Sequence, residues 1–198
     1  VGGAGYVNGD GYADLIFGAS DCDPLSRNRA GCSYIVFGKS TTMADIDVSS
    51  FSSSDGFIVQ GAADDDLSGV SVGGAGDVNG DGYDDVIIGA YVADPSGRIS
   101  AGSAYIIFGK PSGFENIDLL TLNNSVGVAI HGAVAGDWLG NKVSGAGDVN
   151  GDGYDDIIVS AILADPYSRT NAGTVYVLLG NASLTDVDLL LSDEYRGC

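Results

Sequence analysis

Glutamate is almost missing from this chain: only Glu115 and Glu194 occur among 27 acidic residues, so the other 25 are aspartate. Basic residues are few as well, with eight Lys and Arg and one His, and the formal net charge is -19. Nucleic-acid binding needs clustered Lys and Arg that displace counterions, so this composition excludes a nucleic-acid-binding protein. Because glutamate is a good helix former, its scarcity also argues against a helical bundle.

Long apolar runs are missing too. No stretch of 18 or more apolar residues occurs, and Val1–Gly5 carries neither a basic start nor an apolar signal core. We therefore expect no membrane insertion. Since the chain starts without Met and inside a repeated motif, we expect that a leader, tag or upstream sequence preceded Val1.

What the chain does have is glycine and aspartate. Gly contributes 32 residues and apolar residues make up 44% of the sequence. Gly and Asp are turn formers, and the apolar fraction is high enough to build a core. The composition therefore predicts a turn-dense, all-β protein.

The sequence is built from a 71-residue repeat. Val72–Asp85 and Val143–Asp156 are identical at thirteen of fourteen positions, and Val1–Asp14 matches the first of these at twelve. The offset is 71 residues both times. The repeats divide the chain into three units: 1–71, whose first strand is truncated, 72–142, and 143–198, whose last strand is missing.

Each repeat is expected to form four short strands. In the complete middle unit, β-branched and aromatic runs are bounded by Gly, Pro, Asn or Asp. These runs are Val70–Gly74, Asp85–Ala90, Ser103–Phe108 and Val126–His131. Four such strands are typical of one propeller blade, so we predict nearly three four-stranded antiparallel blades. The long connections Lys39–Gly56 and Lys110–Val126 leave room for a helical turn.

An acidic loop with calcium-ligand spacing follows the first strand of the second and third repeats. Oxygen-bearing side chains stand at positions 1, 3, 5 and 9, glycine at position 6 permits the sharp turn, and the position-7 carbonyl completes the set. This all-oxygen, anionic set suits Ca²⁺, and the loop holds no His or Cys for zinc or copper. An unliganded Asx-rich turn is the alternative. The expected ligands are Asp77, Asn79, Asp81, Tyr83 and Asp85, and Asp148, Asn150, Asp152, Tyr154 and Asp156.

The first repeat departs from this pattern, because Tyr6 replaces the first aspartate. The other ligands are kept: Asn8, Asp10, Tyr12 and Asp14. Loss of an anionic ligand weakens a calcium site, so we expect two firm sites and leave the third open. At position 8, Asp84 and Asp155 are interpreted as solvated neighbours of the ligands.

These loops, each preceded by a hydrophobic residue and Gly and followed by an Asp85–Ala90 type of strand, resemble the FG-GAP repeat of integrin α-subunit propellers and their bacterial relatives. The resemblance covers nearly the whole chain. It implies that the calcium loop joins strands one and two on the lower face of each blade and that the ion is structural. The "FG" motif is eroded at Leu67–Gly69 and Leu139–Gly140, and "GAP" becomes GAS, GAY or SAI. These departures favour a bacterial or otherwise distant relative.

Three of the five arginines occupy one repeated position, in the motif Asp-Pro-x-x-Arg-x-x-Ala-Gly: Arg27, Arg98 and Arg169. We place this motif in the loop between strands two and three, opposite the calcium loop. Two interpretations stay open. The arginines form a loop-closing or inter-blade ion pair, or they form a recognition rim for a partner.

Two cysteines bracket the same loop in the first repeat. Cys22 and Cys32 stand where the second repeat has Ala93 and Ser103. We predict a disulfide between them, which suits an oxidising compartment; two buried free thiols are the alternative. Cys198 has no evident partner. Two N-x-Ser motifs are glycosylation acceptors by pattern alone, at Asn123 and Asn181.

No catalytic cluster stands out. One histidine does not make a Ser/His/Asp set, no phosphate-binding Gly loop precedes a helix, and His131 and Trp138 are expected to be structural. The sequence thus predicts a secreted or cell-surface, non-enzymatic adhesion module that binds a protein or glycan. An accessory propeller of a secreted enzyme and a structural spacer are the alternatives. Three blades do not close a ring, so we expect the remaining blades from a longer chain or from a homo-oligomer.

Overall fold

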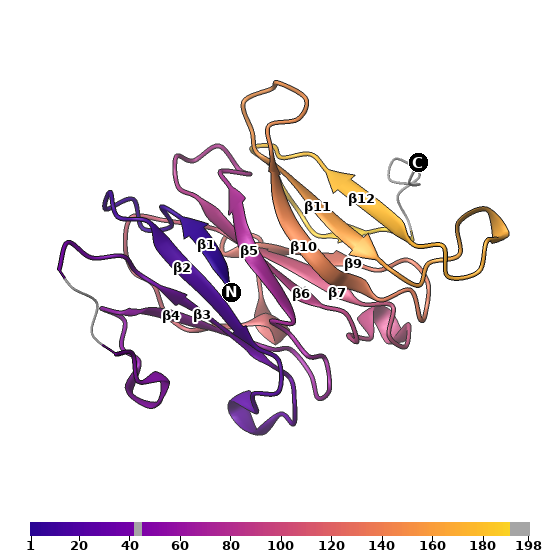
Figure 1. The fold of residues 1–198 in the computed structure, drawn as a ribbon, viewed down its shortest axis with the longest axis horizontal. Coiled ribbons are helices and arrows are strands. Elements are labelled where there is room, and N and C mark those ends of the chain that lie inside the picture. The colour runs from indigo at the N-terminus through magenta and orange to yellow at the C-terminus, as the bar shows by residue number, and fades with distance from the viewer. Residues whose placement is uncertain (42–44, 191–198) are drawn as a thin grey trace.

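The computed structural model describes residues 1–41 and 45–190, which form three β-sheets placed side by side (Figure 1). The all-β prediction is confirmed. Helical structure in these residues is limited to short 3-10 turns, and none of it has the length or apolarity for a membrane crossing. Two of these turns, Val48–Ser50 and Leu119–Thr121, lie in the long connections where a helical turn was expected.

The three sheets correspond to the three repeats, and we call them the first, second and third blade. Neighbouring strands within each blade are antiparallel. The strands of the first blade are β1 (Gly2–Gly5), β2 (Asp14–Ala19), β3 (Cys32–Val36) and β4 (Gly56–Gln60); those of the second are β5 (Ser71–Gly76), β6 (Asp85–Ala90), β7 (Ser103–Ile107) and β9 (Gly127–His131); those described in the third are β10 (Leu139–Gly147), β11 (Asp156–Ala161) and β12 (Thr174–Leu178).

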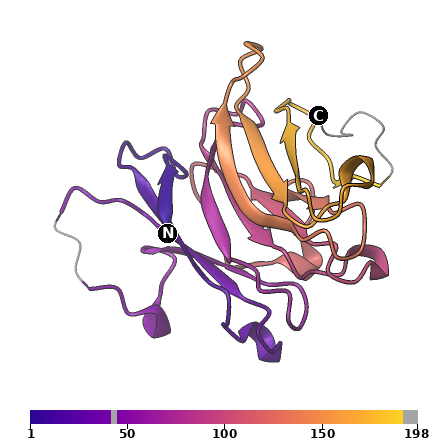
Figure 2. The ribbon, with the colours of Figure 1, turned by 45° about the vertical axis from the view of Figure 1, so that its right-hand side comes forward.

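The first strands of the blades are neighbours: β1 packs beside β5, and β5 beside β10. Figures 1 and 2 show the blades fanning out from these strands, from indigo through magenta to orange and yellow. All loops that join strands one and two therefore lie at the same end of their blades. The loops that join strands two and three lie at the opposite end, so the two kinds of repeated loop occupy opposite faces.

Two very short strands cross from one blade to the next. β8 (Ile117–Asp118) comes from the long connection of the second blade and pairs in parallel with β4 of the first. In the same way β13 (Val187–Asp188), which follows the third blade, pairs with β9 of the second. The sequence prediction missed both, and they couple each blade to the one before it.

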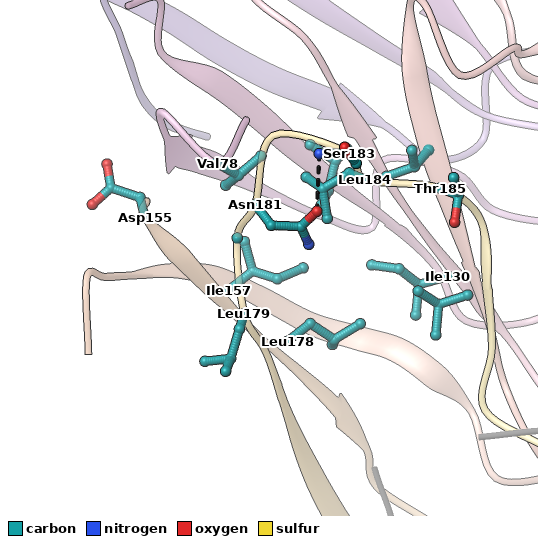
Figure 3. A pocket seen from close by; sticks show the side chains of 14 residues that line it. Val78, Ile130, Asp155, Ile157, Leu178, Leu179, Asn181, Ser183, Leu184 and Thr185 are labelled. Atoms are coloured by element: carbon teal, nitrogen blue, oxygen red, sulfur yellow. Dashed lines mark hydrogen bonds between the residues drawn. The ribbon is translucent and has the colours of Figure 1, made fainter. Parts of the chain in front are cut away.

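Two apolar cores fill the spaces between the blades. Between the first and second blades, Phe114 packs against Phe37 and Phe57, with ring centroids 5.0 and 4.8 Å apart. The repeat puts smaller side chains at two of the corresponding positions between the second and third blades, Val128 and Leu184. Both side chains line an apolar cavity of about 140 Å³ there. Figure 3 shows Leu184 at this cavity.

The outward face of the third blade is apolar and open. Ile158, Val175 and Val177 are 36%, 57% and 45% exposed. Their counterparts in the second blade are almost completely buried against the third: Ile87, Ala104 and Ile106. The third blade thus carries the side chains of an inter-blade core on a face that the described residues do not cover.

Candidate metal centre

The loop between β5 and β6 wraps around the carboxylate of Asp77. Its Oδ1 accepts hydrogen bonds from the backbone N–H groups of Gly80 and Asp81 at 2.8 and 3.0 Å, and its Oδ2 accepts one from Gly82 at 2.9 Å. Asn79 and Asp81 each accept a bond from the amide two residues ahead. The side chains at positions 1, 3 and 5 are therefore held by a tightly curled loop.

The loop between β10 and β11 repeats this geometry. Asp148 accepts bonds from the amides of Gly151, Asp152 and Gly153 at 2.6, 3.1 and 2.9 Å. The Gly153 amide contributes most to holding the pKa of Asp148 below its usual value. A carboxylate that is kept charged at the head of the loop is the state that a cation requires.

The aspartate at position 9 lies beneath each loop and is fully buried. Asp85 accepts bonds from Val78, inside its loop, at 3.0 Å and from Gly109, just beyond β7, at 2.8 Å. Burial raises the pKa of Asp85 to about 8, although these two bonds oppose the shift. The same two bonds recur at the equivalent residues, Asp14 and Asp156. The position-9 aspartate thus ties the loop to the third strand of its own blade, a role that the sequence did not reveal.

The first loop keeps only part of this arrangement. Asn8 accepts from the Asp10 amide, and Asp10 accepts from the Tyr12 amide, as in the other loops. Tyr6 supplies no carboxylate at position 1, and its backbone carbonyl accepts the Gly9 amide instead. Burial raises the pKa of Asp14 in this loop.

The interpretation of Asp84 and Asp155 as merely solvated residues is wrong. Asp84 Oδ2 accepts the backbone N–H of Tyr6 at 2.7 Å, and Asp155 Oδ2 accepts that of Asp77 at 2.9 Å. Each half-buried position-8 carboxylate thus holds position 1 of the loop in the preceding blade. These two bonds form only between neighbouring blades, so the sequence of a single repeat does not reveal them.

The chemistry of the loops fits a hard cation. No three acidic, His or Cys side chains in residues 1–41 and 45–190 form a ready metal-binding group. The loops combine carboxylates with an amide oxygen and a main-chain carbonyl, which is the mixed oxygen set that calcium uses. The two complete loops would hold Ca²⁺ through positions 1, 3, 5, 7 and 9, where it would supply positive charge among the carboxylates.

The opposite face carries the repeated arginines. Arg27 forms a bidentate pair with Asp118 of β8, with nitrogen–oxygen distances of 2.6 and 2.8 Å, and donates to the carbonyl of Gly61. Arg98 pairs with Asp188 of β13 at 2.9 Å and donates to the carbonyl of Gly132. The guanidinium beside Asp118 holds the pKa of that carboxyl below its usual value. These contacts favour the inter-blade ion pair over the recognition rim for Arg27 and Arg98.

Arg169 differs from the other two. It is exposed, stacks over the Tyr167 ring at 5.5 Å and pairs with no carboxylate in the described part of the chain. It belongs to the third blade, and no later blade is described that could supply a carboxylate. Arg27 and Arg98 pair with aspartates of the following repeat, and Arg169 lies in the last blade that the structure describes.

The remaining candidates have structural surroundings. A disulfide joins Cys22 to Cys32, with Cα atoms 5.6 Å apart, whereas Cys198 lies outside the described residues. His131 Nδ1 lies 3.1 Å from Ser103 Oγ, and burial lowers its pKa. Trp138 packs edge-on against Tyr91 of the second blade. Both sequon asparagines, Asn123 and Asn181, are exposed.

Comparison with known proteins places these blades in context. The FG-GAP repeat model matches residues 68–107 and 140–178. Over 124 residues the chain is 32% identical to phosphatidylinositol-glycan-specific phospholipase D of Bos taurus, a match that covers 60% of this chain and 14% of the relative. It is 28% identical to integrin alpha-PS2 of Drosophila melanogaster over 197 residues, 97% of this chain and 13% of the relative. It is 26% identical to integrin alpha-V of Gallus gallus, over 97% of this chain and 17% of the relative. The chain thus spans less than a quarter of these relatives.

Proposed function

We propose that this chain, in which the FG-GAP repeat model matches residues 68–107 and 140–178, is a calcium-stabilised recognition module, displayed outside the cell, that binds a protein or glycan and performs no catalysis itself. Further blades complete its propeller. Calcium fixes the loops at one end of each blade and so holds the loops at the other end in place for a partner.

The observation that carries the calcium assignment is the identical folding of two loops. In both, the position-1 carboxylate, Asp77 or Asp148, accepts three amides of its own loop. The oxygens at positions 3 and 5 are fixed by turns of the same kind. After burial, the charges of Asp81 and Asp77 also raise the pKa of Asp85, and a divalent cation would offset this repulsion.

An extracellular location is supported by the Cys22–Cys32 disulfide, because such bonds persist mainly in oxidising compartments. Exposed sequons at Asn123 and Asn181 fit the same location. The enzyme among the relatives favours one alternative, an accessory propeller attached to a secreted catalytic domain. In that case too, this chain would supply binding and the catalytic residues would lie elsewhere.

Calcium titration by isothermal calorimetry of metal-stripped protein tests the assignment. We expect two tight sites, with Asp77→Ala and Asp148→Ala each removing one of them. Tyr6→Asp supplies the carboxylate that the first loop lacks, so this variant should bind calcium more tightly in that loop than the unchanged protein does. Asp21→Ala changes a largely exposed aspartate outside the loops and serves as the control. Two sites that persist in the Asp77→Ala and Asp148→Ala proteins would refute the ligand assignment.

A further inference from the structure

The same six residues, Val-Asn-Gly-Asp-Gly-Tyr, lie in all three loops between strands one and two, at 7–12, 78–83 and 149–154. Each copy contains an Asn-Gly pair, and the sequence has no other. In such a pair the glycine nitrogen can attack the asparagine side chain, because glycine has no side chain that obstructs the approach. Since the six residues are identical, a difference in reactivity between the loops comes from the fold.

The reaction is a deamidation in two steps. The glycine nitrogen bonds to Cγ of the asparagine, the Cγ–Nδ2 bond breaks, and ammonia leaves with the proton of the backbone N–H. Water then opens the resulting five-membered imide at one of its two carbonyls, which gives aspartate or isoaspartate. A hydrogen bond donated by the glycine N–H slows the first step, because this bond has to break before the nitrogen attacks.

In the two complete loops, a carboxylate holds this N–H. The Gly80 N–H donates to Asp77 Oδ1 at 2.8 Å, and the Gly151 N–H donates to Asp148 Oδ1 at 2.6 Å. A hydrogen bond to an ionised acceptor is about twice as strong as one to a neutral acceptor. The position-1 aspartates therefore restrain the nitrogen that would attack.

The first loop holds the nitrogen less firmly. The Gly9 N–H donates to the neutral carbonyl of Tyr6 at 3.2 Å, and that carbonyl also accepts the Asp84 amide. The asparagine itself is placed as in the other loops: Asn8 Oδ1 accepts the Asp10 amide, and its Nδ2 donates to the Asp10 carboxylate. Gly9 has φ of +66°, close to the +75° and +78° of its counterparts. The acceptor of the glycine N–H is thus the main difference.

We propose that Asn8 is a site of spontaneous deamidation to aspartate and isoaspartate. The position-1 carboxylates suppress the same reaction in the two complete loops, at Asn79 and Asn150. Exposure alone gives a different order, because Asn150 is exposed whereas Asn8 is half-buried. Aspartate at position 8 adds a negative charge to the first loop, and isoaspartate lengthens its main chain by a methylene group. The first loop therefore changes as the protein ages, while the other two keep their asparagines.

Incubation of the folded protein in mildly alkaline buffer with chelator and ¹⁸O-labelled water tests the proposal. The ¹⁸O marks each asparagine that reacts, and peptide mass spectrometry assigns it to a loop. We expect Asn8 to react on the order of tenfold faster than Asn79 or Asn150. Tyr6→Asp should slow Asn8 to the rate of the other two, and Asp77→Ala should speed the reaction of Asn79. Tyr6→Ala removes the same ring without supplying a carboxylate, so this control should leave Asn8 fast.

The unfolded protein shows whether the order comes from the fold. In urea, the three pairs should react at equal rates, because their surrounding residues are the same. An order that persists in urea would overturn the proposal. So would equal rates in the folded protein, fastest reaction at Asn150, or a Tyr6→Asp protein in which Asn8 reacts as fast as before. Chelator is present throughout, so a failure here is separable from a failure of the calcium titration.

Discussion

At the scale of single residues, the junction between two loops depends on a glycine. Gly76 precedes Asp77 and has φ of +78°, and a Cβ there would lie 2.1 Å from Asp155 Oδ2. The carboxylate of the next blade reaches the loop only because this side chain is missing. Gly147 holds the same position in the third blade with φ of +69°, but nothing lies within 4 Å of its Cβ position.

A comparison of alanine substitutions at these two glycines distinguishes the cost of backbone strain from the cost of losing an inter-blade hydrogen bond. Both Gly76→Ala and Gly147→Ala place a side chain in the left-handed region, at a cost of about 1–2 kcal/mol. Gly76→Ala also displaces Asp155 from the Asp77 amide, which adds about 1–3 kcal/mol. We therefore expect Gly76→Ala to lower the free energy of unfolding more than Gly147→Ala does, as measured by urea denaturation. Equal losses would contradict the role of the Asp155 contact.

At the scale of the element, the size of the side chains that each repeat contributes decides how completely the core between two blades is filled. Phe114 fills the first junction, whereas Leu184 leaves the second with a cavity (Figure 3). Leu184→Phe should fill part of this space and raise the free energy of unfolding by about 0.5–2 kcal/mol, measured by urea denaturation. Leu120→Phe, at a side chain that is 63% exposed, is the control and should change little. A destabilised Leu184→Phe protein would mean that the cavity is too rigid to accept the ring.

Strands within a repeat could be predicted from sequence, but contacts between repeats could not. Asp85–Ala90 was predicted to the residue, because an apolar run between turn residues defines a strand locally. β8 and β13 have two residues each and are strands only because a neighbouring blade offers an edge. The oxygen set of the candidate site was readable, whereas the amide bonds of Asp85 and Asp155 depend on Gly109 and Asp77, which lie far away in the sequence. The sequence did carry one signal for β8 and β13, a repeated segment of Asp or Asn, an aliphatic residue and Asp. Comparison of its three copies would have found it: 45–47, 116–118 and 186–188.

At the scale of the whole molecule, the net negative charge and the apolar outward face of the third blade both follow from the repeats. Several of the aspartates that give the chain its net charge of -19 accept backbone amides in the repeated loops, as Asp85 and Asp155 do, or pair with an arginine, as Asp118 does. The exposed apolar residues Ile158, Val175 and Val177 stand where the second blade has a core. Among residues 1–41 and 45–190, this apolar face lies on the same blade as Arg169, which pairs with no described carboxylate.

Calcium bound in the two complete loops should stabilise the folded blades, and thermal unfolding tests this claim most directly. Melting is followed by circular dichroism in excess chelator and in calcium at about 100 times Kd, where each site adds about 2.7 kcal/mol to stability. For a protein of this size, two sites should raise Tm by on the order of 10 °C. The Asp77→Ala, Asp148→Ala double variant should show almost none of this rise. If the unchanged protein melts at the same temperature in chelator and in calcium, the claim is contradicted.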